Sequence, residues 1–429
     1  MNFKMLIVIL LLSLSATAQT NKPSRKMAVV QRTLIRDRFI CRIVWMFFVA
    51  SPGMMPAHAQ LTAGAPVEAT IPIAPMPVKS NGQIHLAYEL HVTNFEARNL
   101  TLNRIEVFAQ GNSTTPLASY RDTELTNLLA RPGAPSNLVD KRVIGGGMRA
   151  VIYLWLTVTA GHPVPTSLRH RLFFTASSSA GNDEEEMMDG AEVTVRKELP
   201  LAVTAPLRGG PWMAGNGPSN AGHHRRMLLA LNGRVTISQR FAYDFMKLGE
   251  DGKAVQGDPS KNENWFGYGS EVLAVADGII SEAQDDIPEN TPLTPKRPIA
   301  IPSAKTVGGN FLILDLGNGN FAFYAHMQPN SLRVKVGDRV RRGEVLGRLG
   351  NSGNSDAPHL HFQISNDPSI SDGEGLPFVF ESFDVLGEAQ LFEALGLETR
   401  EDGWKPPSDA VHSRRQKEMP LDNTVIRFP

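Results

Sequence analysis

Two histidines one residue apart are the most informative feature of the sequence. A run of glycine, asparagine and serine at residues 350–355 leads into the segment PHLHFQI at 358–364. Alternate side chains of a strand point to opposite faces, so His359, His361 and Gln363 share one face and the apolar residues share the other. One imidazole can bind a metal ion through nitrogen while another handles protons. The pattern therefore indicates a metal site, with a merely polar strand face as the alternative.

Two earlier segments could bring further polar side chains to the same place. Residues 311–326 contain two apolar runs joined by Gly-Asn-Gly-Asn, which predicts a β-hairpin whose second strand ends at His326. Residues 235–245 are expected to form a strand with aromatic residues on one side and both Arg240 and Asp244 on the other. An aspartate at this position could face the histidines.

The order of these motifs resembles that of the lysostaphin-like (LytM-type) zinc metallopeptidases, peptidase family M23. Asp244 is followed by the tripeptide YAH, which ends at His326, and then by GNSGNS, three residues and HLHF. The resemblance covers residues 223–387. Two further segments within it also resemble that family: residues 269–278 its strand between two glycines, and residues 336–347 its turn-rich stretch before the active-site loop.

The resemblance implies a role for each matching residue. Asp244 and His361 would be zinc ligands, and His326 and His359 would be the catalytic histidines. Bound zinc can lower the pKa of water from about 15.7 towards about 7, which supplies a nucleophile at neutral pH. The implied activity is that of a zinc metalloendopeptidase that cleaves the peptide cross-links of bacterial peptidoglycan.

One position departs from the family pattern. The family places another zinc-binding histidine four residues before the aspartate, where this chain has Arg240. Arginine has no lone pair to offer a metal, and on an extended strand its guanidinium would lie beside Asp244 and repel the cation. His224, or alternatively His223, at the start of a strand-like segment could replace the missing ligand. Otherwise zinc binds weakly, or the domain has lost zinc and binds peptidoglycan or regulates another cell-wall hydrolase.

The first half of the chain predicts a different domain. Apolar residues alternate with smaller or polar ones at 84–92, which is typical of a half-buried strand with His85 and His91 on the solvent-facing side. Similar runs recur with turn signals between them, so residues 60–206 are expected to form an immunoglobulin-like β-sandwich.

The remaining boundaries follow from composition. Residues 207–222 are rich in glycine, proline and asparagine and predict a linker, and residues 223–387 form the peptidase-like domain. A proline-rich and acidic insertion at 282–305 is expected to be a surface loop near the groove. The polar tail at 388–429, which begins with a short helix, is expected to wrap over the surface. The fold class is therefore all-β, with a sandwich followed by a lysostaphin-like antiparallel sheet.

The N-terminus predicts export. An apolar run at 5–14 precedes a cleavage site after Ala18, while a second possible leader starts at Met27 and ends in cleavage after Ala59. A membrane anchor is the alternative. The expected location is the periplasm or cell envelope, where peptidoglycan peptides would be the partners.

The charge balance and the cysteine count agree with export. Residues 1–59 hold eight of the 43 basic residues and only one of the 43 acidic residues, so the rest of the chain is net acidic. An acidic protein without a basic cluster argues against nucleic acid as a partner. The single cysteine, Cys41, lies in the second possible leader, so the mature protein is expected to need neither disulfides nor a catalytic thiol.

Overall fold

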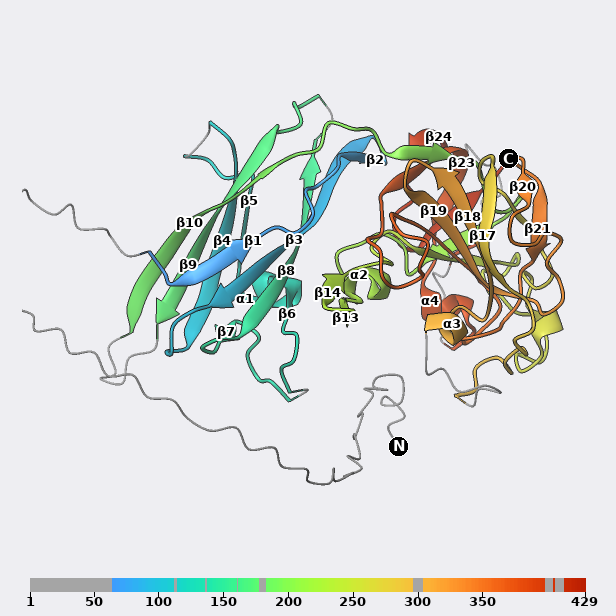
Figure 1. Cartoon of the computed structure of the whole chain (residues 1–429), viewed down its shortest axis with the longest axis horizontal. Coiled ribbons are helices and arrows are strands. Elements are labelled where there is room, and N and C mark those ends of the chain that lie inside the picture. Colours follow the sequence, from blue (N-terminus) through green and yellow to red (C-terminus); the bar gives the residue numbers. More distant parts are fainter. Residues whose placement is uncertain are drawn as a thin grey trace, which may run out of the picture. The chain divides into compact units, whose positions relative to one another are not determined.

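The regular structure in the described part of the chain is mostly β-strand, with a few short helices, which confirms the prediction of an all-β fold (Figure 1). In the described part of the chain, no helix has the length and apolar character needed to cross a membrane. The predicted leader at residues 1–59 lies outside the described residues. The computed structural model describes residues 64–111, 114–135, 137–159, 161–176, 183–295, 304–397, 404–405 and 413–429.

The first domain consists of two antiparallel sheets that enclose a hydrophobic core. The alternation seen at residues 84–92 buries Leu86, Tyr88, Leu90 and Val92 in this core. The two sheets fit the predicted sandwich, while its immunoglobulin-like character stays a prediction. One sheet contains β1 (Val67–Thr70), β2 (Val78–Ser80), β3 (Gln83–Asn94), β6 (Leu129–Ala130) and β8 (Arg149–Val158). The other contains β4 (Leu100–Ala109), β5 (Ala118–Arg121), β7 (Val143–Ile144), β9 (Ser167–Ala176) and β10 (Glu184–Thr194), and α1 (Asp122–Leu128) follows β5.

The outer face of β3 and β8 is not exposed to solvent as the sequence suggested. His85 and His91 are only 5% and 7% exposed. Ala87 and Trp155 on the same face pack against the core of the second domain. The prediction that these histidines face solvent is therefore wrong, because a strand's alternation cannot reveal that a second domain covers its polar face.

The second domain is built on one large sheet, with two small two-stranded sheets beside it. In spatial order its main path contains β11 (Leu201–Val203), β23 (Phe378–Glu388), β25 (Thr424–Arg427), β12 (Trp212–Gly215), β15 (Tyr243–Lys247), β22 (Leu360–Ser365), β19 (Asn320–Met327), β18 (Asn310–Gly317), β17 (Gly278–Gln284) and β20 (Arg339–Val340), while β24 (Ser413–Glu418) pairs with β23. The small sheets pair β13 (Leu229–Leu231) with β14 (Arg234–Thr236) and β16 (Glu271–Leu273) with β21 (Val345–Arg348). The helices are α2 (His223–Arg226), η1 (Asn262–Asn264), α3 (Ala304–Val307) and α4 (Leu391–Ala394).

The strands β15, β22 and β19 lie side by side in the middle of this sheet. The predicted hairpin is present as β18 and β19, which pair antiparallel. Leu360, Phe362 and Ile364 of β22 point into the main hydrophobic core. The opposite face of β22 is therefore free to carry polar side chains.

Several predicted boundaries differ from the structure. The expected linker at 207–222 contains β12, and the expected surface tail at 388–429 contributes β24 and β25 to the sheet. Trp212 and Ile426 are almost fully buried. These strands are short, so the polar and glycine-rich residues around them hide their apolar character.

The sandwich core contains one buried histidine that makes stability depend on pH. His170 lies within hydrogen-bonding distance of the Tyr88 hydroxyl, at 2.8 Å, and of the Ala191 carbonyl, at 2.8 Å. Burial lowers the pKa of His170 from 6.5 to about 4. Between these values the unfolded chain binds more protons than the folded one, so stability is full above pH 6.5 and falls as the pH drops towards 4.

We therefore expect His170→Gln to flatten the pH dependence of unfolding. Between neutral pH and the folded-state pKa of His170, the free energy of unfolding of the wild type should fall by up to roughly 3 kcal/mol more than that of the variant. Urea denaturation of both proteins across this range measures the difference, in which the other histidines cancel. Parallel stability curves for the two proteins would contradict this account of His170.

Candidate metal centre

Three potential metal ligands from separate elements converge in the second domain. Asp244 of β15 and His361 of β22 are directly paired across the two strands. The carboxylate Oδ1 of Asp244 is 3.0 Å from Nδ1 of His361, and its Oδ2 is 3.4 Å from Nε2 of His224 on α2. One ligand atom from each of the three residues lies within 4.8 Å of the other two. One carboxylate and two imidazoles are a typical donor set for zinc.

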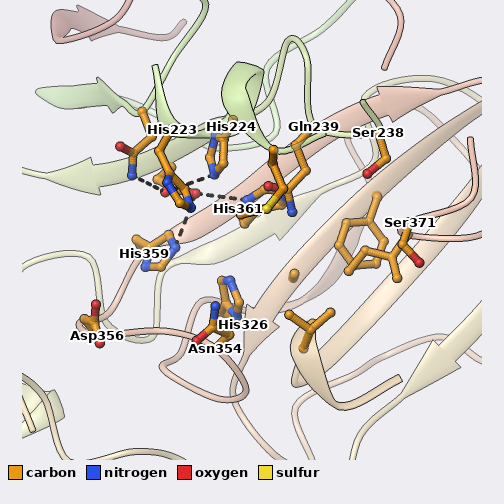
Figure 2. Close-up of a pocket in the computed structure, with 18 of the residues that line it drawn as sticks. His223, His224, Ser238, Gln239, His326, Asn354, Asp356, His359, His361 and Ser371 are labelled. Carbon is orange, nitrogen blue, oxygen red and sulfur yellow. Dashed lines mark hydrogen bonds and ion pairs between the residues drawn. The ribbon is translucent and has the colours of Figure 1, made fainter. Parts of the chain in front are cut away.

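Two more histidines stand beside this cluster (Figure 2). His359 Nε2 is 3.4 Å from Oδ1 of Asp244. The ring of His326 is 4.8 Å from that of His359 and 5.9 Å from that of His361, measured between centroids. His326 also has a φ of +63°, a conformation that is costly for a residue other than glycine and that clusters at functional sites.

Hydrogen bonds to the far side of each ring leave one nitrogen facing the pocket. Nδ1 of His361 is 3.0 Å from Oδ1 of Asp244 and its Nε2 is 3.0 Å from Oε1 of Gln363, so this ring lies between two oxygen acceptors. The two neighbouring histidines use backbone carbonyls instead. His359 donates from Nδ1 to the oxygen of Ala357 at 2.7 Å. Partners of this kind fix the tautomer and orientation of metal-site histidines.

His326 is held in the same way. Its Nδ1 lies 2.8 Å from the carbonyl oxygen of Ser352, in the glycine-rich loop. Because a carbonyl only accepts, the proton of neutral His326 sits on Nδ1 and the lone pair is on Nε2.

Burial and the Asp244 charge set the protonation states. Burial lowers the pKa of His224 to about 4, so this imidazole is neutral near pH 7. Burial alone would raise the pKa of Asp244, but His224 and His359 hold it well below its usual range. The site therefore offers a charged carboxylate and a neutral imidazole, as a divalent cation requires.

His326 and His359 differ from each other in the direction of their pKa shifts. Burial, reinforced by the neighbouring His359 and His361, lowers the pKa of His326 well below its usual range. Burial also opposes the charged form of His359, but the Asp244 carboxylate outweighs it and raises the pKa of His359. The pocket thus holds one imidazole that resists protonation and one that favours it.

The structure brings together five of the six residues singled out from the sequence: His224, Asp244, His326, His359 and His361. His223, the alternative to His224, is exposed and lines the same pocket, but it is not one of the three clustered ligands. The segment 224–231 was expected to be a strand throughout, whereas it begins in the single-turn helix α2.

The expected repulsion by Arg240 is not found. β15 begins only at Tyr243, and a turn precedes it in which the amide of Arg240 donates to the carbonyl of Ile237. The guanidinium pairs with Glu89 at 2.9 Å and with Glu374 at 2.8 Å. The prediction that it lies beside the metal site is wrong, because residues 240 and 244 are not on one extended strand.

The pocket has a volume of about 340 Å³ and includes residues that the sequence analysis missed. Asn216, in the segment predicted as a linker, donates from Nδ2 to Oδ2 of Asp244 at 2.8 Å. Ser238, Gln239 and Ser371 supply further polar atoms to its lining. These residues carry no spacing or motif that could have marked them in advance.

The insertion at 282–305 supports the active-site loop. The amide of Asn351 donates to Glu289 at 3.0 Å. Nδ2 of Asn290 donates to the carbonyls of Gly353 and Ser355, both at 2.9 Å. The described part of the insertion therefore braces the loop that leads to His359.

Comparison with known proteins identifies relatives of this domain. Residues 266–372 match the model of peptidase family M23, a range that includes His326, His359 and His361 but begins after Asp244. Lysostaphin of Staphylococcus staphylolyticus is 36% identical over 107 residues, which are 23% of this chain and 21% of that protein. Cell division protein DipM of Caulobacter vibrioides is 30% identical over 104 residues, which are 24% of this chain and 14% of that protein.

These matches cover only part of each relative. The chain spans 12% to 21% of the length of the first curated relatives that it matches. Among solved structures, the catalytic domain of lysostaphin from Staphylococcus simulans is 25% identical and covers 39% of this chain and 88% of that one, with a TM-score of 0.21.

The geometry predicts different consequences for the two adjacent histidines of α2. We expect His224→Ala to weaken zinc binding at least about 100-fold, because it removes one of three donors, whereas even a supporting partner is typically worth 10- to 100-fold. His223→Ala is the matched control and should bind zinc like the wild type. Competition of the metal-stripped proteins with a chromophoric chelator measures both affinities. Equal losses in the two variants would contradict the assignment of His224.

Proposed function

The chain carries a peptidase family M23 domain at residues 266–372, and from this premise we propose that it is a zinc metalloendopeptidase that cleaves peptide cross-links of bacterial peptidoglycan. The observation that carries the proposal is the convergence of His224, Asp244 and His361 on one point beside two more histidines. Three protein ligands are the number that catalytic zinc sites normally keep, with a further position left for substrate or water.

In this proposal His224, Asp244 and His361 hold the ion. Gln363 supports the set by accepting a hydrogen bond from Nε2 of His361, and Asn216 does so by donating one to Asp244. Zinc, when bound, supplies a Lewis acid that polarises a peptide carbonyl and makes water acidic near neutral pH.

The remaining histidines divide the proton chemistry. In this proposal His326 accepts a proton from the attacking water through the lone pair of Nε2, because its Nδ1 is held by the Ser352 carbonyl. In this proposal His359, whose Nε2 lies 3.4 Å from Oδ1 of Asp244, is the hydrogen-bond donor that stabilises negative charge on the carbonyl oxygen and then gives its proton to the leaving amine. The carbonyls of Ser352 and Ala357 keep the two rings oriented for these tasks.

The proposed substrate matches the expected location. Peptidoglycan lies outside the cytoplasm, and the N-terminal segment has two alternative export leaders, ending at Ala18 or at Ala59. We therefore propose that the protein acts in the periplasm or cell envelope. The ShyA protein of Vibrio cholerae, a peptidoglycan DD-endopeptidase by name, is 36% identical over 56 residues, and this likeness favours the same class of substrate.

Digestion of purified sacculi tests this function. We expect the zinc-loaded protein to release cross-link peptides with new amino termini, identified by mass spectrometry. His361→Ala should abolish both zinc binding and release. His326→Ala and His359→Ala should keep zinc but lower the rate about 10²- to 10³-fold, as the loss of one transition-state contact typically does.

The opposite result has a defined meaning. If the wild-type protein binds zinc and sediments with sacculi but releases no peptide, the peptidase proposal is wrong. The domain would then be a module that binds peptidoglycan or regulates another cell-wall hydrolase. Activity that survives in His361→Ala would place the catalytic centre elsewhere.

A further inference from the structure

A buried cluster of charges joins the first domain to the helix that carries His224. Glu89 of β3, Arg225 of α2 and Arg240 are only 3%, 1% and 5% exposed. The carboxylate of Glu89 lies 3.3 Å from Arg225 and 2.9 Å from Arg240. The sandwich carboxylate therefore pairs with two buried guanidinium groups of the second domain, of which Arg240 also pairs with Glu374.

Arg225 makes further contacts to the sandwich. Its Nη2 donates to the carbonyl of Tyr88 at 3.0 Å and to that of Leu154 at 2.8 Å, on β3 and β8. The guanidinium also lies over the rings of Tyr153 and Trp155, 5.8 and 5.4 Å from their centroids. Every one of these contacts is made by the first domain.

The next residue of α2 adds to the same attachment. The guanidinium of Arg226 lies 4.3 Å from the centre of the Tyr153 ring. Its Nη2 donates to the carbonyl of Asn127 at 2.7 Å. Two consecutive side chains after His224 are thus fixed on the sandwich.

The helix α2 depends on such contacts for its position. It is four residues long, and its N-cap residue is Gly222, which has no side chain to donate or accept a capping hydrogen bond. A helix of one turn is not stable by itself, because the unfavourable free energy of helix nucleation exceeds the stabilisation from a single hydrogen-bonded turn. The contacts of Arg225 and Arg226 therefore decide where the His224 ring lies relative to Asp244.

We propose that the sandwich is a working part of the metal centre, with Glu89 and Arg225 as positioning residues that hold His224 against Asp244 and His361. This inference rests on the proposed function and gives the first domain a role in it. Arg240, at the place where the family pattern has a histidine ligand, pairs with the same Glu89 carboxylate. The third ligand of the proposed site therefore lies on a helix that contacts the neighbouring domain and not on the strand of Asp244.

Glu89→Gln in the full chain tests this role. Removing the charge loosens Arg225 and with it His224, so zinc affinity should fall about 10- to 100-fold, as is typical when a supporting partner of a metal ligand is lost. Glu374→Gln is the matched control, because Glu374 is also buried and pairs with Arg240 at 2.8 Å, but from within the second domain. It should bind zinc close to the wild-type affinity.

Two additional measurements separate positioning from general support of the fold. In a His224→Ala background, Glu89→Gln should cause no further loss of zinc affinity, because the residue through which it acts is gone. Cobalt-substituted Glu89→Gln should lose the part of the visible spectrum that the wild type owes to its His224 ligand. If Glu89→Gln fails to fold by circular dichroism, Arg225→Lys replaces it, since lysine keeps the charge but not the planar fork.

The outcomes distinguish this inference from the function on which it rests. Unchanged zinc affinity in Glu89→Gln or in Arg225→Lys, beside a wild type that binds zinc, would overturn only the role of the sandwich. Equal losses of zinc affinity in Glu89→Gln and Glu374→Gln would also overturn only the role of the sandwich. An equally large loss when Glu89→Gln is made in the His224→Ala background would do so too. A wild type that binds no zinc would overturn the metal centre itself.

Discussion

The pairing register of β15 and β22 is the constraint on which the site depends. It sets Asp244 directly opposite His361, while Tyr243 and Phe245 are opposite Phe362 and Leu360. These apolar neighbours are buried in the main core, so they fix the register that the polar pair needs. A slip of β22 by one residue would turn His361 into the core and Phe362 outwards, which makes alternative registers costly. Packing on one face of the sheet thereby fixes the positions of the polar side chains on the other face.

The rest of the centre is added to this pair from the sides. β19 pairs with β22 and sets Ala325 opposite His361, so that His326 follows at the point where the strand leaves the regular ladder. The glycine-rich loop accepts a hydrogen bond from His326, and the insertion around Glu289 braces that loop. His224 alone comes from outside the sheet, on a helix attached to the first domain. The dependence of one ligand on a distant domain links the stability of the sandwich to the chemistry of the pocket.

Much of the site could be predicted because it lies on regular strands. The alternation at 359–364 and the hairpin signal at 317–320 are local patterns, and they placed His326 and His361 on the correct strands, while His359 directly precedes β22. The position of Arg240 could not be predicted, because a turn before β15 and a carboxylate from another domain determine it. For the same reason His85 and His91 were expected in solvent. A polar residue that another domain buries looks the same in a sequence as one that faces water.

Zinc-edge anomalous diffraction from crystals of the full chain tests the central claim most directly. The account predicts one strong peak at about 2.0–2.1 Å from Nε2 of His224 and Nδ1 of His361, with the Asp244 carboxylate as the third ligand. A peak bound by Asp244 and His361 without His224, or no peak in this pocket, would contradict it.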